Sequence, residues 1–353
     1  MNTSSTTIHQ YIDRQTSRVV TERLIGDRTV AFLYNTLREN APAMFRALTS
    51  ARMSSLLGFY NYDLPGKPLH QTRKVFTRLG IDWRECVAPL STYTSMRRIF
   101  ERQIKYWECR PMDDDPDIVV SPADARLLLG SFSMTSSLFI KEKFFDLSEL
   151  LGCDSRWYPR FSAGDFAVCR LTPDKYHYNH LPVSGQVADI YEVDGRYHSC
   201  NPLASISIAS IQSKNRRVIT IIDTDVEGGS RVGLVAMIEV VALMIGDIKQ
   251  AYSSWQYSSP QPVRPGHFLR KGCPKSLYRP GSSTDVLIFE PDRIEFCPDL
   301  VINSSRSGVH SRFSGLTWGP LVETDIKVRS PLARRREGGS RFDLYSPPDR
   351  QRG

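Results

Sequence analysis

The sequence lacks the features that mark secreted and membrane-spanning proteins. Its seven cysteines show no Cys-x-x-Cys pair and no disulfide-dense spacing, so a reducing compartment is the simpler expectation. The first residues form neither a basic nor an apolar segment, and we therefore expect no signal peptide. The most apolar window, residues 232–245, is interrupted by Glu239 and is shorter than the ~20 residues that a spanning helix needs. Its β-branched residues predict buried strands instead.

Signatures of nucleic-acid binding and of metal binding are also missing. The net charge of +8 favours an anionic partner, yet no nucleic-acid-binding motif accompanies it, which leaves acidic lipid as the expected partner. The pair His177-x-x-His180 could supply two metal ligands, but no Cys or carboxylate stands at zinc-like spacing from it. We expect no nucleic acid and no metal.

The composition is that of an ordinary globular protein, with 41% hydrophobic and 10% aromatic residues. From Asp117 onward, short strand-like runs alternate with Gly, Pro, Asp and Asn clusters, which predicts a β-rich domain after a helical region and an α+β fold. We divide the chain into a flexible N-terminus (1–26), a helical membrane-associating region (27–110), a β-rich domain (111–335) and a disordered basic tail (336–353).

The helical region has an amphipathic pattern. Asn40-Ala-Pro42 is typical of a helix start, and apolar residues including Phe45, Leu56 and Phe59 then recur at helical spacing among arginines. A second helical stretch, residues 93–107, carries Arg97, Arg98, Arg102 and Lys105. These helices either lie on a membrane surface with arginines toward lipid phosphates or pack on the β-rich domain, and the sequence leaves both open.

One tetrapeptide, Gly281-Ser282-Ser283-Thr284, has the composition of a self-cleavage site. In a bent turn the Ser hydroxyl can attack the preceding Gly carbonyl, because Gly adds no bulk and accepts strained backbone angles. The resulting ester can eliminate to dehydroalanine, which hydrolyses to ammonia and a pyruvoyl group. The tetrapeptide alone is also common in plain turns, so its significance depends on other segments.

Two further motifs precede it. They are Ser121-Pro-Ala-Asp124 and Tyr176-His177-Tyr-Asn-His180-Leu-Pro182-Val-Ser-Gly185. Together with the Gly-Ser-Ser segment, these two motifs resemble those of the phosphatidylserine decarboxylase family in residue type, in order along the chain and in the number of residues between them. The resemblance covers about residues 105–335. Lys175 stands where the family often has Asp, and Pro-Gly-Ser-Ser replaces the commoner Leu-Gly-Ser-Thr.

The resemblance implies both a fold and site roles. It implies antiparallel sheets in a barrel-like or sandwich-like catalytic domain behind an N-terminal helical layer. Cleavage between Gly281 and Ser282 would turn Ser282 into the pyruvoyl group, with His180 as base and Asp124 orienting it. His177 would act in decarboxylation, although a histidine bonded to backbone in the core is an alternative. Ser283 is the alternative nucleophile, since Ser283-Thr284-Asp285 also begins a family-like Ser-Thr-apolar run.

The family's activity gives the first of three hypotheses. It is decarboxylation of phosphatidylserine to phosphatidylethanolamine through a Schiff base with a covalent pyruvoyl group, without pyridoxal phosphate. A pyruvoyl decarboxylase of a soluble amino acid such as tryptophan is the second, and a basic lipid-binding protein that is never cleaved is the third. For the first we expect a heterodimer of two chains, β and α, from one precursor, peripheral on the cytoplasmic face of the cell membrane and otherwise cytoplasmic. Homo-oligomerisation is left open.

Overall fold

The computed structural model describes residues 8–24, 37–50, 69–132, 146–153, 155–199, 201–207, 211–242, 247–280, 283–316 and 319–337. The segments expected to hold Leu56 and Phe59, the Gly281–Ser282 bond and most of the basic tail lie outside these ranges.

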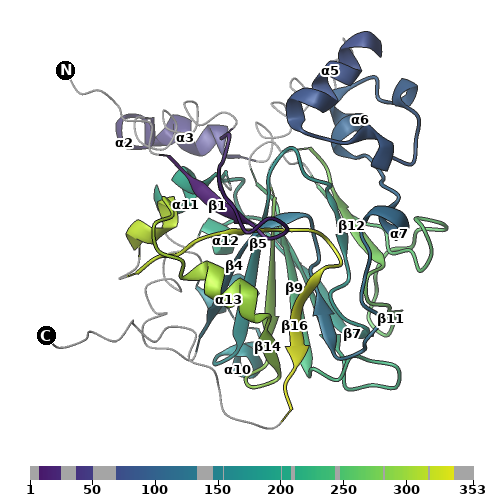
Figure 1. Cartoon of the computed structure of the whole chain (residues 1–353). Coiled ribbons are helices and arrows are strands. Elements are labelled where there is room, and N and C mark those ends of the chain that lie inside the picture. The colour runs from purple at the N-terminus through teal and green to yellow at the C-terminus, as the bar shows by residue number, and fades with distance from the viewer. Residues whose placement is uncertain are drawn as a thin grey trace, which may run out of the picture.

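A ten-stranded sheet forms the centre of the described structure (Figure 1). Its strands run in the order β11-β7-β8-β9-β13-β5-β4-β15-β1-β2, and its neighbours pair antiparallel except for β1 and β15. In chain order the bounds are β1 (Gln10–Asp13), β2 (Val19–Thr21), β4 (Ala125–Ser131), β5 (Asp165–Leu171), β7 (Gly185–Val193), β8 (Arg217–Asp223), β9 (Leu234–Val240), β11 (Phe268–Leu269), β13 (Ser283–Phe289) and β15 (Thr324–Ile326).

Two three-stranded sheets accompany the large one. The first has the order β10-β12-β6 and the second β14-β16-β3. Their bounds are β10 (Ile248–Gln250), β12 (Pro274–Tyr278), β6 (Tyr178–His180), β14 (Ile294–Phe296), β16 (Pro331–Arg335) and β3 (Ile118–Val120).

Most of the described helices are short. The N-terminal set, of which Figure 1 shows α5 and α6 projecting from one corner, comprises α2 (Arg38–Asn40), α3 (Pro42–Leu48), α5 (Leu69–Leu79), η3 (Trp83–Glu85), η4 (Leu90–Thr92), α6 (Met96–Phe100) and α7 (Tyr106–Cys109). The remaining helices are α9 (Leu147–Leu151), α10 (Tyr158–Phe161), α11 (Pro202–Ser207), α12 (Ile211–Lys214), α13 (Pro298–Ser304) and η6 (Arg312–Leu316).

The predicted α+β class is confirmed, whereas the barrel or sandwich detail is not. The ten described strands run from edge strand β11 to edge strand β2 without closing. The apolar window at residues 232–245 supplies the buried strand β9, and residues 243–246 lie outside the described part. Within the described residues, no helix has the length and apolarity to cross a bilayer.

The N-terminus differs from the flexible segment that the sequence predicted. Residues 10–21 form the β1–β2 hairpin, and β1 pairs in parallel with β15 near the other end of the chain. Ile12 is fully buried and packs with Val309 and Val322. Because the hydrogen bonds come from β15 and the apolar contacts from Val309 and Val322, all far along the chain, local sequence gives little sign of this order.

Part of the expected membrane-binding surface is also buried. Phe45 on α3 lies in a small core with Leu37 and Ala204 and stacks on His198, so the side chain does not face solvent. Arg102 is buried, and its guanidinium donates to the carbonyls of Ile99 and Asp174. The expectation that these two side chains contact lipid is therefore wrong.

The strand that follows the expected cleavage site is central in the sheet. β13 lies between β9 and β5, and all its residues are buried. Leu287 and Phe289 join the core on one face, and Val286 and Ile288 join the core on the other. This alternation places Ser283 and Asp285 on the Leu287 face, toward the small sheet β10-β12-β6.

Candidate active site

Asp124 is a buried carboxylate fixed by one arginine and one backbone amide. Arg110 donates from Nε and Nη2 to Oδ1 and Oδ2 at 3.0 and 2.8 Å, and the Val328 amide donates to Oδ1 at 2.8 Å. Burial opposes ionisation, but the charge and hydrogen bonds of Arg110 outweigh it and hold the pKa of Asp124 below its ordinary value. Asp124 is therefore ionised at neutral pH.

His180 ends β6, and both its ring nitrogens have partners. Nδ1 lies 2.8 Å from the carbonyl of Gly272, and Nε2 lies 2.9 Å from the hydroxyl of Tyr176. A carbonyl only accepts, so Nδ1 carries the proton and Nε2 accepts from Tyr176. Burial lowers the pKa of His180 to about 3, which keeps the ring neutral and available as a base.

His177 has the same tautomer but an unoccupied basic nitrogen. Its Nδ1 donates to the Lys175 carbonyl at 2.8 Å, and the ring stacks on Phe100 with centroids 3.6 Å apart. Nε2 is buried and has no hydrogen-bond partner among the described residues. Burial, together with the charge of Arg102, lowers the pKa of His177 to about 3. The lone pair of Nε2 is thus free to accept a proton or bind a ligand.

The structure brings Asp124 and the two histidines into one buried region without a direct Asp–His bond in the described part. The negative charge of Asp124 nevertheless acts on both rings, raising the pKa of each against the larger effect of burial. His180 stands opposite Pro274 in the β6–β12 pair, whereas the amide of Tyr278 donates to the His177 carbonyl at 3.0 Å. His177 is therefore nearer in register to the expected cleavage turn.

The predicted cleavage bond itself, Gly281–Ser282, lies outside the described residues, but both of its flanks are placed. β12 ends at Tyr278 and β13 begins at Ser283, whose Oγ is buried and has no partner in the described part of the chain. The Tyr278 hydroxyl lies 3.0 Å from the Thr284 carbonyl and 2.7 Å from Asp285 Oδ1. The Tyr278 side chain therefore links the end of β12 to the start of β13, although the two strands belong to different sheets.

Sequence reasoning missed several members of this region. Arg110, the partner of Asp124, carries no local signal, because only tertiary structure brings α7 to that carboxylate. Tyr176 is not among the predicted site residues, yet its hydroxyl binds His180 and also Tyr257 at 2.6 Å. Its place four residues before His180, with a polar atom on a buried ring, was the available signal.

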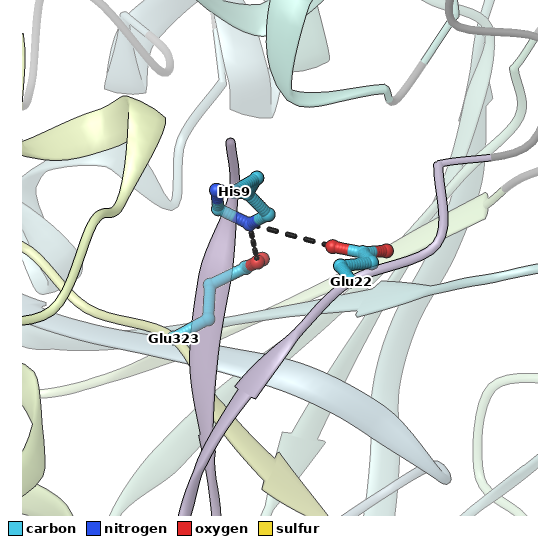
Figure 2. Close-up of side chains that lie close together, drawn as sticks. All are labelled: His9, Glu22 and Glu323. Atoms are coloured by element: carbon cyan, nitrogen blue, oxygen red, sulfur yellow. Dashed lines mark hydrogen bonds and ion pairs between the residues drawn. The ribbon is translucent and has the colours of Figure 1, made fainter. Parts of the chain in front are cut away.

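A second polar cluster contains one histidine and two glutamates (Figure 2). His9 Nε2 lies 2.8 Å from Glu323 and 3.4 Å from Glu22, and their ligand atoms are close enough to hold a metal ion. Arg170, however, already donates to both carboxylates at 2.6–3.1 Å. The Arg312 amide donates to His9 Nδ1 at 3.2 Å, so Nε2 carries the proton and points it at the glutamates.

These contacts indicate an ion-pair cluster rather than a metal centre. A cation at this point would face the Arg170 guanidinium and a protonated ring nitrogen. The cluster joins the N-terminal hairpin and β5 to the segment before β15, on opposite sides of the expected cleavage bond. It is thus placed to hold the two products of cleavage together.

Comparison with known proteins matches the sequence of this chain to one family. The family described as phosphatidylserine decarboxylase matches residues 96–309. A phosphatidylserine decarboxylase proenzyme from Chlamydia trachomatis serovar L2 is 32% identical over 308 residues, covering 86% of this chain and 93% of the relative. The proenzyme from Ruminiclostridium cellulolyticum is 30% identical over 321 residues (90% and 99%), and that from Fusobacterium nucleatum 27% over 297 residues (84% and 92%). The chain belongs to the phosphatidylserine decarboxylase family.

Proposed function

We propose that this protein is a self-processing phosphatidylserine decarboxylase, which converts phosphatidylserine to phosphatidylethanolamine and carbon dioxide. Family membership supports the reaction. The observation that carries it for this chain is a buried group of Asp124 and two neutral histidines, one of which accepts a backbone hydrogen bond from Tyr278 at the end of β12. The names of the relatives, which are proenzymes, support processing into two chains.

Self-cleavage between Gly281 and Ser282 is the first step of this proposal. His180 takes the hydroxyl proton of Ser282 as the serine attacks the Gly281 carbonyl, and the charge of Asp124 stabilises the imidazolium that forms. The proton on His180 Nδ1, fixed by Gly272, leaves Nε2 as the basic atom once the Tyr176 hydroxyl turns away. His177 is left to act on the substrate.

The reverse assignment of the two histidines has its own support. His177 Nε2 needs no partner displaced, at least among the described residues, and its backbone binds Tyr278 near the turn. Cleavage by single variants decides between the two histidines, as described in the Discussion.

Ser283 is the alternative origin of the pyruvoyl group. Its buried Oγ at the start of β13 has no partner among the described residues and supports it, because such a hydroxyl is normally bonded unless it has a catalytic or strained role. Cleavage before Ser282 and cleavage before Ser283 give C-terminal chains that differ by the mass of one serine residue. Intact mass spectrometry therefore separates them.

The pyruvoyl carbonyl supplies the electrophile for the substrate amine and the sink for the electrons released with carbon dioxide. The chain's own residues do the rest: Phe100 fixes the plane of the His177 ring, and burial keeps both rings neutral and water away. Nε2 of His177 is then free to bind a polar atom of the substrate head group.

The substrate and the location are tested together. We propose that the enzyme is peripheral on anionic membrane at the cytoplasmic face, with exposed arginines of the N-terminal helices, such as Arg46, near lipid phosphates. The experiment is carbon dioxide release by the purified enzyme from phosphatidylserine vesicles and from free tryptophan, with the mass of each chain measured on the same sample. Two chains and turnover of the lipid support the proposal. An intact chain without turnover favours a lipid-binding protein, and faster turnover of tryptophan favours the soluble amino-acid decarboxylase.

A further inference from the structure

Two buried carboxyl groups face each other across the centre of the large sheet. Glu239 of β9 and Asp285 of β13 are direct partners in the antiparallel register, and neither is exposed to solvent. Direct partners point to the same face of a sheet, so the two side chains are neighbours. Because the two carboxyl groups are neighbours and are both buried away from water, ionisation of both at once is strongly disfavoured.

Glu239 has the partners that an ionised carboxylate needs. Lys275 Nζ lies 2.7 Å from Oε2 and Gln250 Nε2 lies 2.8 Å from the same oxygen. Asn179 Nδ2 donates to Oε1 at 3.2 Å, and the Ser276 hydroxyl donates to it as well. Burial opposes its charge, but Lys275 and these donors lower the pKa of Glu239. Glu239 is therefore the ionised member of the pair.

Asp285 has almost none of these partners. The Tyr278 hydroxyl donates to Oδ1 at 2.7 Å, while Oδ2 is buried and has no partner among the described residues. Its other cross-strand neighbour, Cys169 of β5, offers no positive charge. Burial, with the charge of Glu239 added, raises the pKa of Asp285. The proton of this neutral acid belongs on Oδ2, the oxygen without a donor.

Asp285 lies on the same strand face as Ser283, one of the two candidate cleavage serines. The two residues stand in one row of side chains on β13, one repeat of the pleat apart, and Ser283 Oγ likewise has no partner in the part of the chain that the structure describes. The next residues on this face, Leu287 and Phe289, are apolar core. The polar end of the row is thus the end that meets the cleavage turn.

We propose that Asp285 is the proton donor to the substrate carbon after carbon dioxide leaves. The bond between that carbon and the carboxylate breaks, and its electron pair then forms a C–H bond with the proton of Asp285 Oδ2. Asp285 becomes a carboxylate, which the Tyr278 hydroxyl stabilises until solvent returns a proton on product release. This inference rests on the proposed decarboxylase function, and it adds a residue that lies outside the Ser-Pro-Ala-Asp, Tyr-His-x-x-His and Gly-Ser-Ser-Thr segments.

The activity test separates processing from decarboxylation. Asp285→Asn keeps the shape and the acceptor for Tyr278 but holds no acid proton. We expect it to cleave into two chains, with kcat on phosphatidylserine reduced about 10²-fold or more. The wild-type kcat should also fall at high pH as Asp285 ionises, and the variant should lack that limb. Glu290→Gln, a carboxyl-to-amide change one residue beyond the far end of β13, is the matched control and should keep kcat within about twofold.

The second test measures the acid itself and needs no activity. In the uncleaved Ser282→Ala/Ser283→Ala protein, infrared difference spectra at pH 7 against the same protein with Asp285→Asn should contain a protonated carboxyl band that shifts in deuterium oxide. Absence of that band overturns the proposal, and so does a cleaved Asp285→Asn enzyme with wild-type kcat and pH profile. If the Asp285→Asn precursor fails to cleave, the Asp285→Val enzyme is measured instead, and the same reduction in kcat is expected of it. If neither variant cleaves, the proposal that Asp285 acts in decarboxylation and not in processing is overturned. A wild type without decarboxylase activity would instead refute the proposed function.

Discussion

Arg110 binds both oxygens of Asp124, so the last residue of the N-terminal helical region fixes the first residue of the predicted catalytic group. The same guanidinium donates to Glu85 at 3.0 Å from Nη1 and Nη2. Arg110 thus bridges two carboxylates that belong to different parts of the fold. The helical region consequently helps to set the charge and position of Asp124.

Arg110→Ala should leave Asp124 as a buried, unpaired carboxylate. We expect a loss of stability on the order of 3–5 kcal/mol, measured by urea unfolding of the uncleaved Ser282→Ala/Ser283→Ala protein, and slower cleavage in the otherwise wild-type chain. Arg110→Lys should recover little, because one ammonium cannot form the paired contacts to two carboxylates. Arg84→Ala, at an exposed arginine one residue before Glu85, is the control and should change neither quantity appreciably. Normal cleavage in Arg110→Ala would contradict the role given to this pair.

Asp124→Asn and His180→Ala should leave the precursor largely uncleaved. Loss of a positioned general base slows such a step on the order of 10²- to 10⁴-fold. His177→Ala should still cleave but decarboxylate poorly. A time course on denaturing gels, followed by carbon dioxide release from the cleaved fraction, measures both steps. If His177→Ala blocks cleavage and His180→Ala does not, the two histidines have the opposite roles.

Glu323→Gln should weaken the contact between the two chains in a pH-dependent way. Burial opposes the charge of Glu323, but Arg170 outweighs it and lowers the pKa below the ordinary value of ~4.3. A lowered pKa gives stability that is present above that ordinary value and is lost as pH falls below it toward the folded value. The expected loss at pH 7 is about 1.5–3 kcal/mol, shrinking at pH 3.

The measurement is urea unfolding of the uncleaved Ser282→Ala/Ser283→Ala protein with and without Glu323→Gln at pH 7, 5 and 3. Asp299→Asn, which weakens the more exposed pair with Arg14, provides a control with a smaller effect. An equal loss from Glu323→Gln at all three pH values would show that charge is not the source of its contribution.

Membrane attachment should need both charge and apolar insertion. High salt should weaken flotation with anionic vesicles, since the Debye length falls to about 3 Å at 1 M. Leu56→Asp with Phe59→Asp, in a segment outside the described residues, should abolish it at any salt. Ile302→Asp, at a site 67% exposed on α13, is the control and should float as wild type does. Flotation of the double variant at wild-type levels would remove the helical region from the membrane contact.

The sequence by itself determined the chemistry and its order along the chain. Three motifs placed Asp124, the two histidines and the Gly-Ser-Ser turn in one family, because a reaction demands particular side chains at fixed positions. It also predicted buried strand structure in the window of residues 232–245, where β9 lies, since runs of β-branched and apolar residues carry that information locally.

Only the tertiary structure decided which ionisable groups lie next to one another. His9 and Glu323 are 314 positions apart, and Glu239 meets Asp285 only through the register of β9 and β13. The same is true of Arg110 with Asp124 and of the N-terminal hairpin on β15. Hydrogen-bond register and burial arise from pairing between distant segments, and the pKa of a buried group depends on both. Local sequence names a carboxyl group, but its neighbours in the fold decide whether that group carries a charge or a proton.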